Sequence, residues 1–221
     1  MTNIVDVIEA DFHIHSKYSK DSLLSPKSVI RVAKKKGLSA IAITDHETIK
    51  GAKEAMKENE SSDDFFVIPG IEIKTEIGDI IGLFVEETFL FKDIYEAIDK
   101  IKKMDGLLVL PHPLRGHKEI PKKVILETDL IEALNGRSPS LKNREAKELA
   151  IYCNKPLIAG SDAHFLFEIG CVRTVLSGFA GDLEDLRKLI KHGERILIGR
   201  ESPFFVHILS WGIELFKQFF V

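Results

Sequence analysis

Histidine and carboxylate side chains follow apolar runs at several widely separated places in this chain of 221 residues. Imidazole and carboxylate groups are the ligands that zinc, manganese and iron take in proteins. The positions are Asp11, His13, His15, Asp45, His46, Glu72, His112, Asp162 and His164. One tetrahedral ion could not use so many ligands, so the set predicts a cluster of two or three divalent metal ions (Zn, Mn or Fe).

The first pair, His13 and His15, is separated by one residue. On a strand, residues two apart share one face, so both imidazoles can reach the same ion or neighbouring ions. Such a pair alone is weak evidence for a metal, because strand faces are often polar. Its joint occurrence with Glu72, His112 and the Asp162-x-His164 pair is what carries the prediction.

Short apolar runs alternate with helix-length amphipathic segments along the chain, the pattern of a parallel sheet whose strands are connected by helices. Seven runs end near residues 15, 44, 70, 110, 135, 160 and 176, and we expect seven parallel strands closed into a barrel. Active groups of parallel barrels lie at the carboxyl ends of the strands, where each candidate ligand falls. Ser25 and Pro26 indicate a helix start, and Gly78-Asp79 indicates a hairpin turn between runs 67–73 and 76–84.

Several segments together resemble a known family. The stretches DFHIHSKYSKDSLLSP, AIAITDHETIKG, VIPGIEI, LPHP, IEALNGR and IAGSDAH are similar, in order and spacing, to the motifs of the polymerase and histidinol phosphatase (PHP) superfamily. The resemblance covers about residues 10–200 and implies an α/β fold, a distorted (β/α)7 barrel with a metal cluster for phosphoester hydrolysis. We therefore expect a barrel domain over residues 1–200 and an apolar C-terminal helix over residues 201–221.

The resemblance also implies the ligands, position by position. Those matching the family's motifs are His13, His15, Asp21, His46, Glu72, His112, Asp162 and His164. Among these, Glu72 matches the carboxylate that bridges two metals, and Asp21 and His46 match ligands of a third. Where some members have another histidine, this chain offers Asn135 or, as the weaker choice, Glu132.

Metal-activated hydroxide would attack phosphorus in such a site. The leaving group needs a proton or a cation, which His164, Asp162 or a third metal could supply. Arg115 is the preferred phosphate clamp, with Arg137 and Lys17 as weaker candidates. We expect Asp11 and Asp45 to orient ligand imidazoles.

The overall composition narrows the function classes. A formal net charge of −3 gives no basic excess, so nucleic acid is neither implied nor excluded. Cys153 and Cys171 belong to no CxxC motif, which favours free thiols in a cytoplasmic protein. The N-terminus lacks the basic start and apolar core of a signal peptide.

The segment from Phe204 onward is apolar on almost all sides, which predicts a helix that needs cover. We expect it to pack across the end of the barrel or to form a homo-oligomer with a second subunit. A membrane span is disfavoured because Glu214 and Lys217 interrupt a segment that is barely long enough.

These observations favour a cytoplasmic metal-dependent phosphoesterase that acts on a small phosphorylated substrate, either a phosphomonoester or a short nucleotide or oligonucleotide. A 5'-end-directed nuclease is the alternative within this chemistry. A metal-binding regulatory module without turnover and a metal-dependent hydrolase of carbon esters or amides remain open as other classes.

Overall fold

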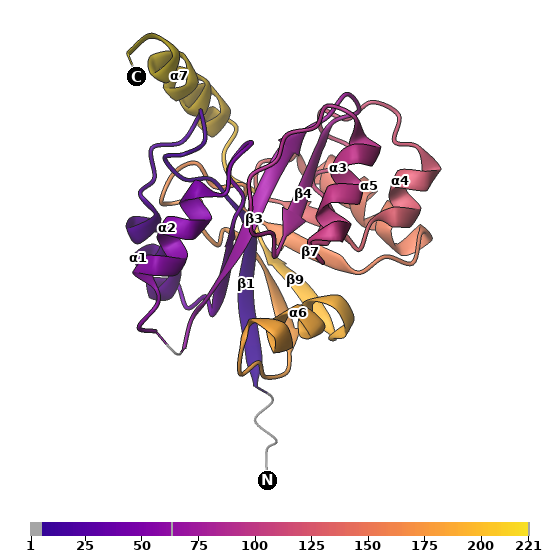
Figure 1. Cartoon of the computed structure of the whole chain (residues 1–221), viewed down its shortest axis with the longest axis horizontal. Coiled ribbons are helices and arrows are strands. Elements are labelled where there is room, and N and C mark those ends of the chain that lie inside the picture. Colours follow the sequence, from indigo (N-terminus) through magenta and orange to yellow (C-terminus); the bar gives the residue numbers. More distant parts are fainter. Residues whose placement is uncertain (1–5, 63, 221) are drawn as a thin grey trace.

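One sheet, curled into a nearly closed barrel, organises the chain (Figure 1). The structure is a computed structural model that describes residues 6–62 and 64–220. Within these residues the strands are β1 (Val7–Ile14), β2 (Ala40–Ile43), β3 (Phe66–Lys74), β4 (Asp79–Leu83), β5 (Leu107–Leu110), β6 (Leu130–Asn135), β7 (Leu157–Gly160), β8 (Val172–Ser177) and β9 (Arg195–Gly199). The helices are α1 (Pro26–Lys35), α2 (Lys50–Glu58), α3 (Ile94–Lys103), α4 (Lys122–Glu127), α5 (Ser140–Tyr152), α6 (Leu183–His192) and α7 (Phe205–Phe220). The expected α/β barrel with a C-terminal helix is confirmed.

The strand order is β7-β6-β5-β4-β3-β2-β1-β8-β9. Strands β1, β2 and β3 are parallel to one another, as are β5, β6 and β7. Strand β4 lies antiparallel between β3 and β5, which confirms the hairpin expected at Gly78-Asp79. The expectation that the run ending near residue 176 is a seventh parallel strand was wrong, because β8 is antiparallel to β1. An apolar run indicates a buried strand but not its direction.

The carboxyl ends of β1 and β7 close the sheet. The Asp162 amide donates to the His13 carbonyl at 2.7 Å, and the His15 amide donates to the Ala163 carbonyl at 2.9 Å. These bonds join the two ends of the parallel set directly above the barrel core. Residues that are about 150 positions apart in sequence therefore meet at one end of the fold.

Helices cover both flanks of the sheet, with α1 and α2 on one side and α3, α4 and α5 on the other (Figure 1). Helix α1 begins as expected, because the Ser25 hydroxyl accepts the Ser28 amide at 3.2 Å and Pro26 fills its first position. Its apolar face is buried through Val29 and Ala33, against the sheet. Each buried aliphatic side chain of this kind contributes about 1.5–3 kcal/mol to folding.

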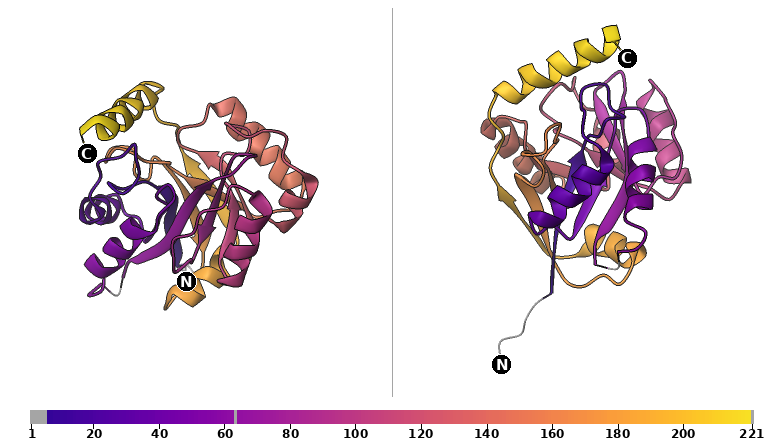
Figure 2. Two further views of the ribbon diagram at one scale, coloured as in Figure 1. Left: turned by 45° about the horizontal axis from the view of Figure 1, so that its top comes forward. Right: turned by 90° about the vertical axis from the view of Figure 1, so that its left-hand side faces the viewer.

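Helix α7 lies across the carboxyl end of the barrel, away from the flanking helices (Figure 2). Its residues Val206 and Ser210 are buried, whereas Ile208 and Phe219 are mostly exposed. Among the helices of the described ranges, none combines the length and apolarity needed to cross a membrane.

Candidate metal centre

The expected ligands meet at the carboxyl end of the barrel. They come from the end of β1, the loop after it, the segment after β2, strand β3, and the segments after β5 and β7. Four groups of potential ligands have donor atoms that all lie within 4.8 Å of one another in each group. The groups are His15, Asp21, His46 and His164; His13, His15 and Asp162; His13, His112 and Glu132; and Glu72, Asp79 and His112.

At the centre, two imidazoles and two carboxylates face one another. His13 Nε2 lies 3.1 Å from His15 Nε2. Glu72 Oε2 is 3.4 Å from His13 Nε2 and 3.3 Å from His15 Nε2, and Asp162 Oδ1 is 3.7 Å and 3.3 Å from the same two atoms. All four side chains are buried, so water does not separate these charges.

The hydrogen bonds on the far side of these rings fit a cation between them. His13 Nδ1 lies 3.0 Å from Glu132 Oε1, and because a carboxylate only accepts, the proton belongs on Nδ1. The lone pair of His13 Nε2 then faces His15 and the oxygens of Glu72 and Asp162. Such an arrangement is repulsive unless a proton or a metal ion lies within it.

The pKa values of His15 and Glu72 are shifted by the opposite charges that surround them. Burial lowers the pKa of His15, but hydrogen bonds to Asp162 and Glu72 outweigh it and raise that pKa to about 9. Burial would raise the pKa of Glu72, yet His13 and His46 hold it well below its usual range. The carboxylates are therefore ionised at neutral pH and attract positive charge to this point.

A second cluster is formed by Asp21, His46 and His164. Asp21 Oδ2 lies 2.9 Å from His164 Nε2 and 3.5 Å from His46 Nε2, and His46 Nδ1 lies 3.1 Å from Glu72 Oε2. Despite these short distances, Asp21 Oδ1 and His164 Nε2 are buried atoms without a hydrogen-bond partner among the described residues. Unsatisfied buried donors and acceptors are rare in folded proteins, and a metal ion would satisfy both.

His112 and Glu72 form a third contact. His112 Nε2 lies 3.2 Å from Glu72 Oε1, while the buried His112 Nδ1 has no hydrogen-bond partner within the described part of the chain. Asp79, at the start of β4, adds a carboxylate to this group, although the sequence indicated only a turn at this position. Glu72 thus offers one oxygen to His112 and the other to His13, His15 and His46.

Asn135, expected among the ligands, is occupied by other contacts. Its Oδ1 accepts from Arg115, from the Arg137 amide and from Ser138, and its Nδ2 donates to Glu132 Oε2 at 2.9 Å. Glu132 accepts in addition the His112 amide at 2.8 Å. Glu132 therefore contacts the ring of His13 and the backbone amide of His112, and Asn135 contacts Glu132.

The expected orienting carboxylates act differently from the prediction. Asp11 accepts the backbone amides of His13, Ser161 and Gly170, and Asp45 accepts from Ser16 and Ser19, so neither contacts an imidazole. Ser19 connects Asp45 to His15, because its hydroxyl lies 2.9 Å from His15 Nδ1. The carboxylate that contacts the outward-facing nitrogen of His13, Nδ1, is Glu132. Burial raises the pKa of Asp11 to about 6.

Of the expected substrate cations, Arg115 alone reaches the centre. It donates to Asn135 Oδ1 at 3.0 Å and forms an ion pair with Asp162. Arg137 is instead buried in a two-bond ion pair with Glu168, at 2.9 and 3.1 Å. Lys17 pairs with Glu54 on the surface, so it does not line the cavity.

Two candidate ligands have left-handed backbone conformations. His112 has a φ of 27° and Asp162 a φ of 55°, which is unusual for residues other than glycine. Each conformation costs on the order of 1–3 kcal/mol and concentrates at functional sites. Both residues follow a strand end, where this turn brings the side chain back over the barrel mouth.

A cavity of about 280 Å³ opens above the clustered side chains. The barrel contributes Asp21, His46, Glu72, Asp79, His112, Arg115, Arg137, Asp162 and His164 to its lining, and α7 contributes His207, Ser210, Trp211 and Glu214. Helix α7 therefore forms one wall of the candidate site. The sequence predicted this helix only as an apolar segment that packs on the barrel or on a second subunit, because its polar residues form no recognisable motif.

The model of the PHP domain family matches residues 11–198. The chain belongs to the PHP domain family. Protein MJ0417 of Methanocaldococcus jannaschii is 34% identical over 174 residues, which span 74% of this chain and 68% of that protein.

Two solved structures share the PHP-like fold of this chain. One is a two-domain protein from Bacteroides vulgatus that contains a predicted PHP-like metal-dependent phosphoesterase, with a TM-score of 0.76 and 20% identity, covering 94% of this chain and 70% of that one. The other is an amidohydrolase from Chromobacterium violaceum with bound sulfate, with a TM-score of 0.61 and 16% identity, covering 91% and 96%. At these identities the likeness concerns the fold alone.

Proposed function

We propose that this PHP domain protein is a metal-dependent phosphoesterase that hydrolyses phosphomonoesters or short nucleotide phosphoesters. The observation that carries the proposal is the convergence of buried imidazoles and ionised carboxylates, several with unsatisfied atoms, at the mouth of the barrel. Membership in the family and the fold shared with a protein that contains a predicted PHP-like metal-dependent phosphoesterase support the same chemistry.

The side chains divide into adjoining ligand sets for two or three divalent ions (Zn, Mn or Fe). His13, His15 and Asp162 would hold one ion, and Asp21, His46 and His164 another, while Glu72 and His112 lie against both sets or a further ion. Bound divalent cations supply water activation and polarisation of a phosphoryl oxygen in phosphoesterases.

At the position where some family members have another histidine, we propose that Glu132 orients His13 by accepting its proton and that Asn135 in turn holds Glu132. Glu132 receives the His13 Nδ1 proton, which leaves His13 Nε2 free to bind a metal. Asn135 has no unused oxygen, since three donors already converge on it. We therefore assign no metal to Asn135.

Arg115 is the candidate that binds substrate. Its guanidinium lies between Asp162 and Asn135 on the cavity wall, where a phosphate oxygen would meet it. Burial would raise the pKa of Asp162, but Arg115 and His13 hold that pKa well below its usual range. Burial and the neighbouring His15 lower the pKa of His164. Asp162 and His164 are therefore suited to be ligands at neutral pH, and poorly suited to be proton donors.

The size of the cavity favours a small substrate. Its volume of about 280 Å³ is at the lower end of the range for small-molecule sites, and α7 walls one side of it. A phosphomonoester or a terminal nucleotide fits this space better than a continuous duplex. A nuclease that trims 5' ends remains the second candidate, because an end can enter where the middle of a strand cannot.

The decisive experiment compares substrates on protein loaded with Mn²⁺ or Zn²⁺. We expect turnover of an aryl phosphate, loss of turnover with a chelator, and a decrease of at least about 10³-fold in His13→Ala, because one ligand of the cluster is removed. His192→Ala is the matched control, since His192 is exposed on α6 far from the cavity. Metal binding without turnover of any mono- or diester would favour a regulatory module.

The same panel separates the alternatives. Faster turnover of 5'-phosphorylated oligonucleotides than of mononucleotides would favour the nuclease. An amide or carbon ester as the preferred substrate would replace the phosphoesterase, an outcome worth testing because an amidohydrolase shares this fold.

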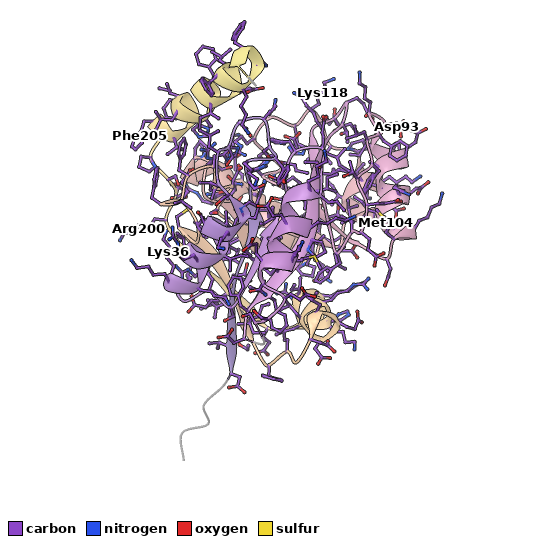
Figure 3. The ribbon with its side chains drawn as sticks, turned by 60° about the vertical axis from the view of Figure 1, so that its left-hand side comes forward. Lys36, Asp93, Met104, Lys118, Arg200 and Phe205 are labelled. Atoms are coloured by element: carbon purple, nitrogen blue, oxygen red, sulfur yellow. The ribbon has the colours of Figure 1, made fainter. Side chains whose placement is uncertain are left out.

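We propose further that the protein is cytoplasmic and self-associates through α7. Both cysteines are free, as a reducing compartment requires. Helix α7 exposes Phe205 and Phe219, the preceding Phe204 is exposed as well, and Figure 3 shows Phe205 at the start of this helix. Light scattering after gel filtration tests the association. A monomer at all concentrations would contradict it.

A further inference from the structure

The loop over residues 16–22 carries Asp21 into the candidate metal centre and contacts α7. Lys217, on the last turns of α7, directs its ammonium group at this loop. Its Nζ donates to the carbonyl oxygens of Lys17 at 2.7 Å, Ser19 at 2.6 Å and Ser22 at 2.7 Å. An ammonium group has three N–H donors, so these three bonds use all of them.

The inner side of the loop is fixed to the barrel by separate contacts. The Ser22 hydroxyl donates to the carbonyls of His15 and His164, at 3.1 and 3.3 Å. Asp45 accepts from the hydroxyls of Ser16 and Ser19. Lys217 acts on the outer side, where it gathers three carbonyl dipoles around one positive charge.

Asp21 is the member of its cluster that depends on this loop. His15 and His164 adjoin the bonded ends of β1 and β7, and His46 follows β2, whereas Asp21 lies within the loop between two of the carbonyls that Lys217 binds. Its Oδ2 must nevertheless lie 2.9 Å from His164 and 3.5 Å from His46. The path of the loop backbone therefore decides whether Asp21 reaches the cluster.

Helix α7 is itself held at its other end. Arg137 donates to the Ser210 hydroxyl at 2.9 Å, and His207 Nε2 lies 3.0 Å from the Arg137 carbonyl. Midway along the helix, Glu214 pairs with Lys20 of the loop at 2.7 Å. These contacts fix the helix across the mouth and place Lys217 over the loop.

We propose that Lys217 is a positioning residue: by binding three carbonyls of loop 16–22 it holds Asp21 toward His46 and His164, so that α7 completes the metal centre. The consequence for metal binding rests on the proposed function. The effect of Lys217 on the loop does not.

Hydrogen exchange of the metal-free protein tests whether Lys217 orders loop 16–22. Lys217→Met keeps the aliphatic stem and removes the ammonium, and Gln218→Met is the matched control on an exposed neighbouring position. Within the loop, the Lys17 amide is bonded to the Leu24 carbonyl and the Ser19 amide to the Ser16 carbonyl. We expect these amides to exchange at least about tenfold faster in Lys217→Met, while peptides from β1, β3 and β7 are unchanged.

Calorimetric titration with Mn²⁺ tests whether the ordered loop strengthens metal binding through Asp21. Lys217→Met should weaken one Mn²⁺ site by about tenfold or more and leave the other affinity as in the wild type, because the His13 group does not use Asp21. Gln218→Met should reproduce the wild-type isotherm.

Several results would overturn the proposal. Equal loop exchange in the two variants would show that the three bonds do not order the loop. Faster exchange in the barrel strands of Lys217→Met would assign the lysine to global stability. Faster loop exchange with an unchanged Mn²⁺ isotherm would show that Asp21 needs no such support. Because exchange is measured without metal or substrate, a failure of the phosphoesterase proposal would leave the loop result readable.

Discussion

The buried ion pair between Arg137 and Glu168 should make the barrel mouth sensitive to the loss of either partner. Arg137 is 6% exposed and Glu168 is 0% exposed, and the pair joins the end of β6 to the segment after His164. Replacing Arg137 by Met removes both ion-pair bonds and the bonds of the guanidinium to Ser210 and the Val206 carbonyl. Among the described residues, the Glu168 carboxylate then keeps the amides of His164 and Phe165 as donors. Leaving one member of a buried pair uncompensated costs about 3–5 kcal/mol.

Two assays measure this cost. Urea unfolding followed by circular dichroism should give a free energy of unfolding lower by about 3–5 kcal/mol for Arg137→Met. Since about 1 kcal/mol shifts Tm by roughly 2–4 °C in a protein of this size, the melting temperature should decrease by roughly 6–20 °C. Arg144→Met, at an exposed position on α5, is the matched control and should stay within about 0.5 kcal/mol of the wild type.

A second substitution tests the physical reason. Glu168→Gln in the Arg137→Met background removes the unpaired charge while an amide oxygen can still accept the backbone amides of His164 and Phe165. We expect the double variant to regain about 1–2 kcal/mol relative to Arg137→Met, because a neutral amide is easier to bury than a carboxylate. A single variant within about 1 kcal/mol of the wild type, or a double variant that is no more stable than the single, would refute the argument.

Three further results are expected. Gly160→Ala should weaken Mn²⁺ binding by about tenfold or more in a calorimetric titration, because a Cβ there would overlap Glu132 Oε1 and His13 Cβ; an unchanged isotherm would mean that both side chains can shift freely. Burial raises the pKa of Cys171 to about 11, so in Cys153→Ser protein its alkylation by iodoacetamide at pH 8 should be about 100-fold slower than in urea and should accelerate up to about pH 11; equal rates would show an exposed thiolate. Removing bound metal with a chelator should lower Tm by roughly 5–10 °C, since a ligand at 100 times its Kd stabilises by about 2.7 kcal/mol, and a scan that does not change would argue against a resident metal.

The fold was predictable wherever an apolar run reports burial. The runs around β1, β2, β3, β5, β6 and β7 all became strands in the expected places. Strand β9 was not predicted because its apolar run, Ile196 to Ile198, is only three residues long, and Ile196 and Ile198 are exposed at the edge of the sheet. The direction of β8 was missed because direction depends on the connection and not on the strand itself.

The grouping of the expected ligands was predictable from residue types at strand ends. The positions of Glu132 and Asn135, which contact these ligands or one another, were not predictable. Glu132 and Asn135 are three apart, so on a regular strand they would point to opposite faces. The pairing of β6 with β7 shifts register between Glu132 and Leu134, and this irregularity brings both side chains to the same cluster. No sequence pattern signals such a shift, so a choice between the two residues needs coordinates.

The direction in which β1 runs through the barrel decides where a tag can be attached. The strand enters the barrel at Val7, at the pole opposite α7, and reaches the candidate metal centre at His13 (Figure 1). Affinity tags, dyes or surface linkers attached ahead of Val7 would therefore project away from the mouth, whereas the same groups fused after α7 would hang beside it. Protein that is to be attached to a surface should therefore be coupled through its amino terminus.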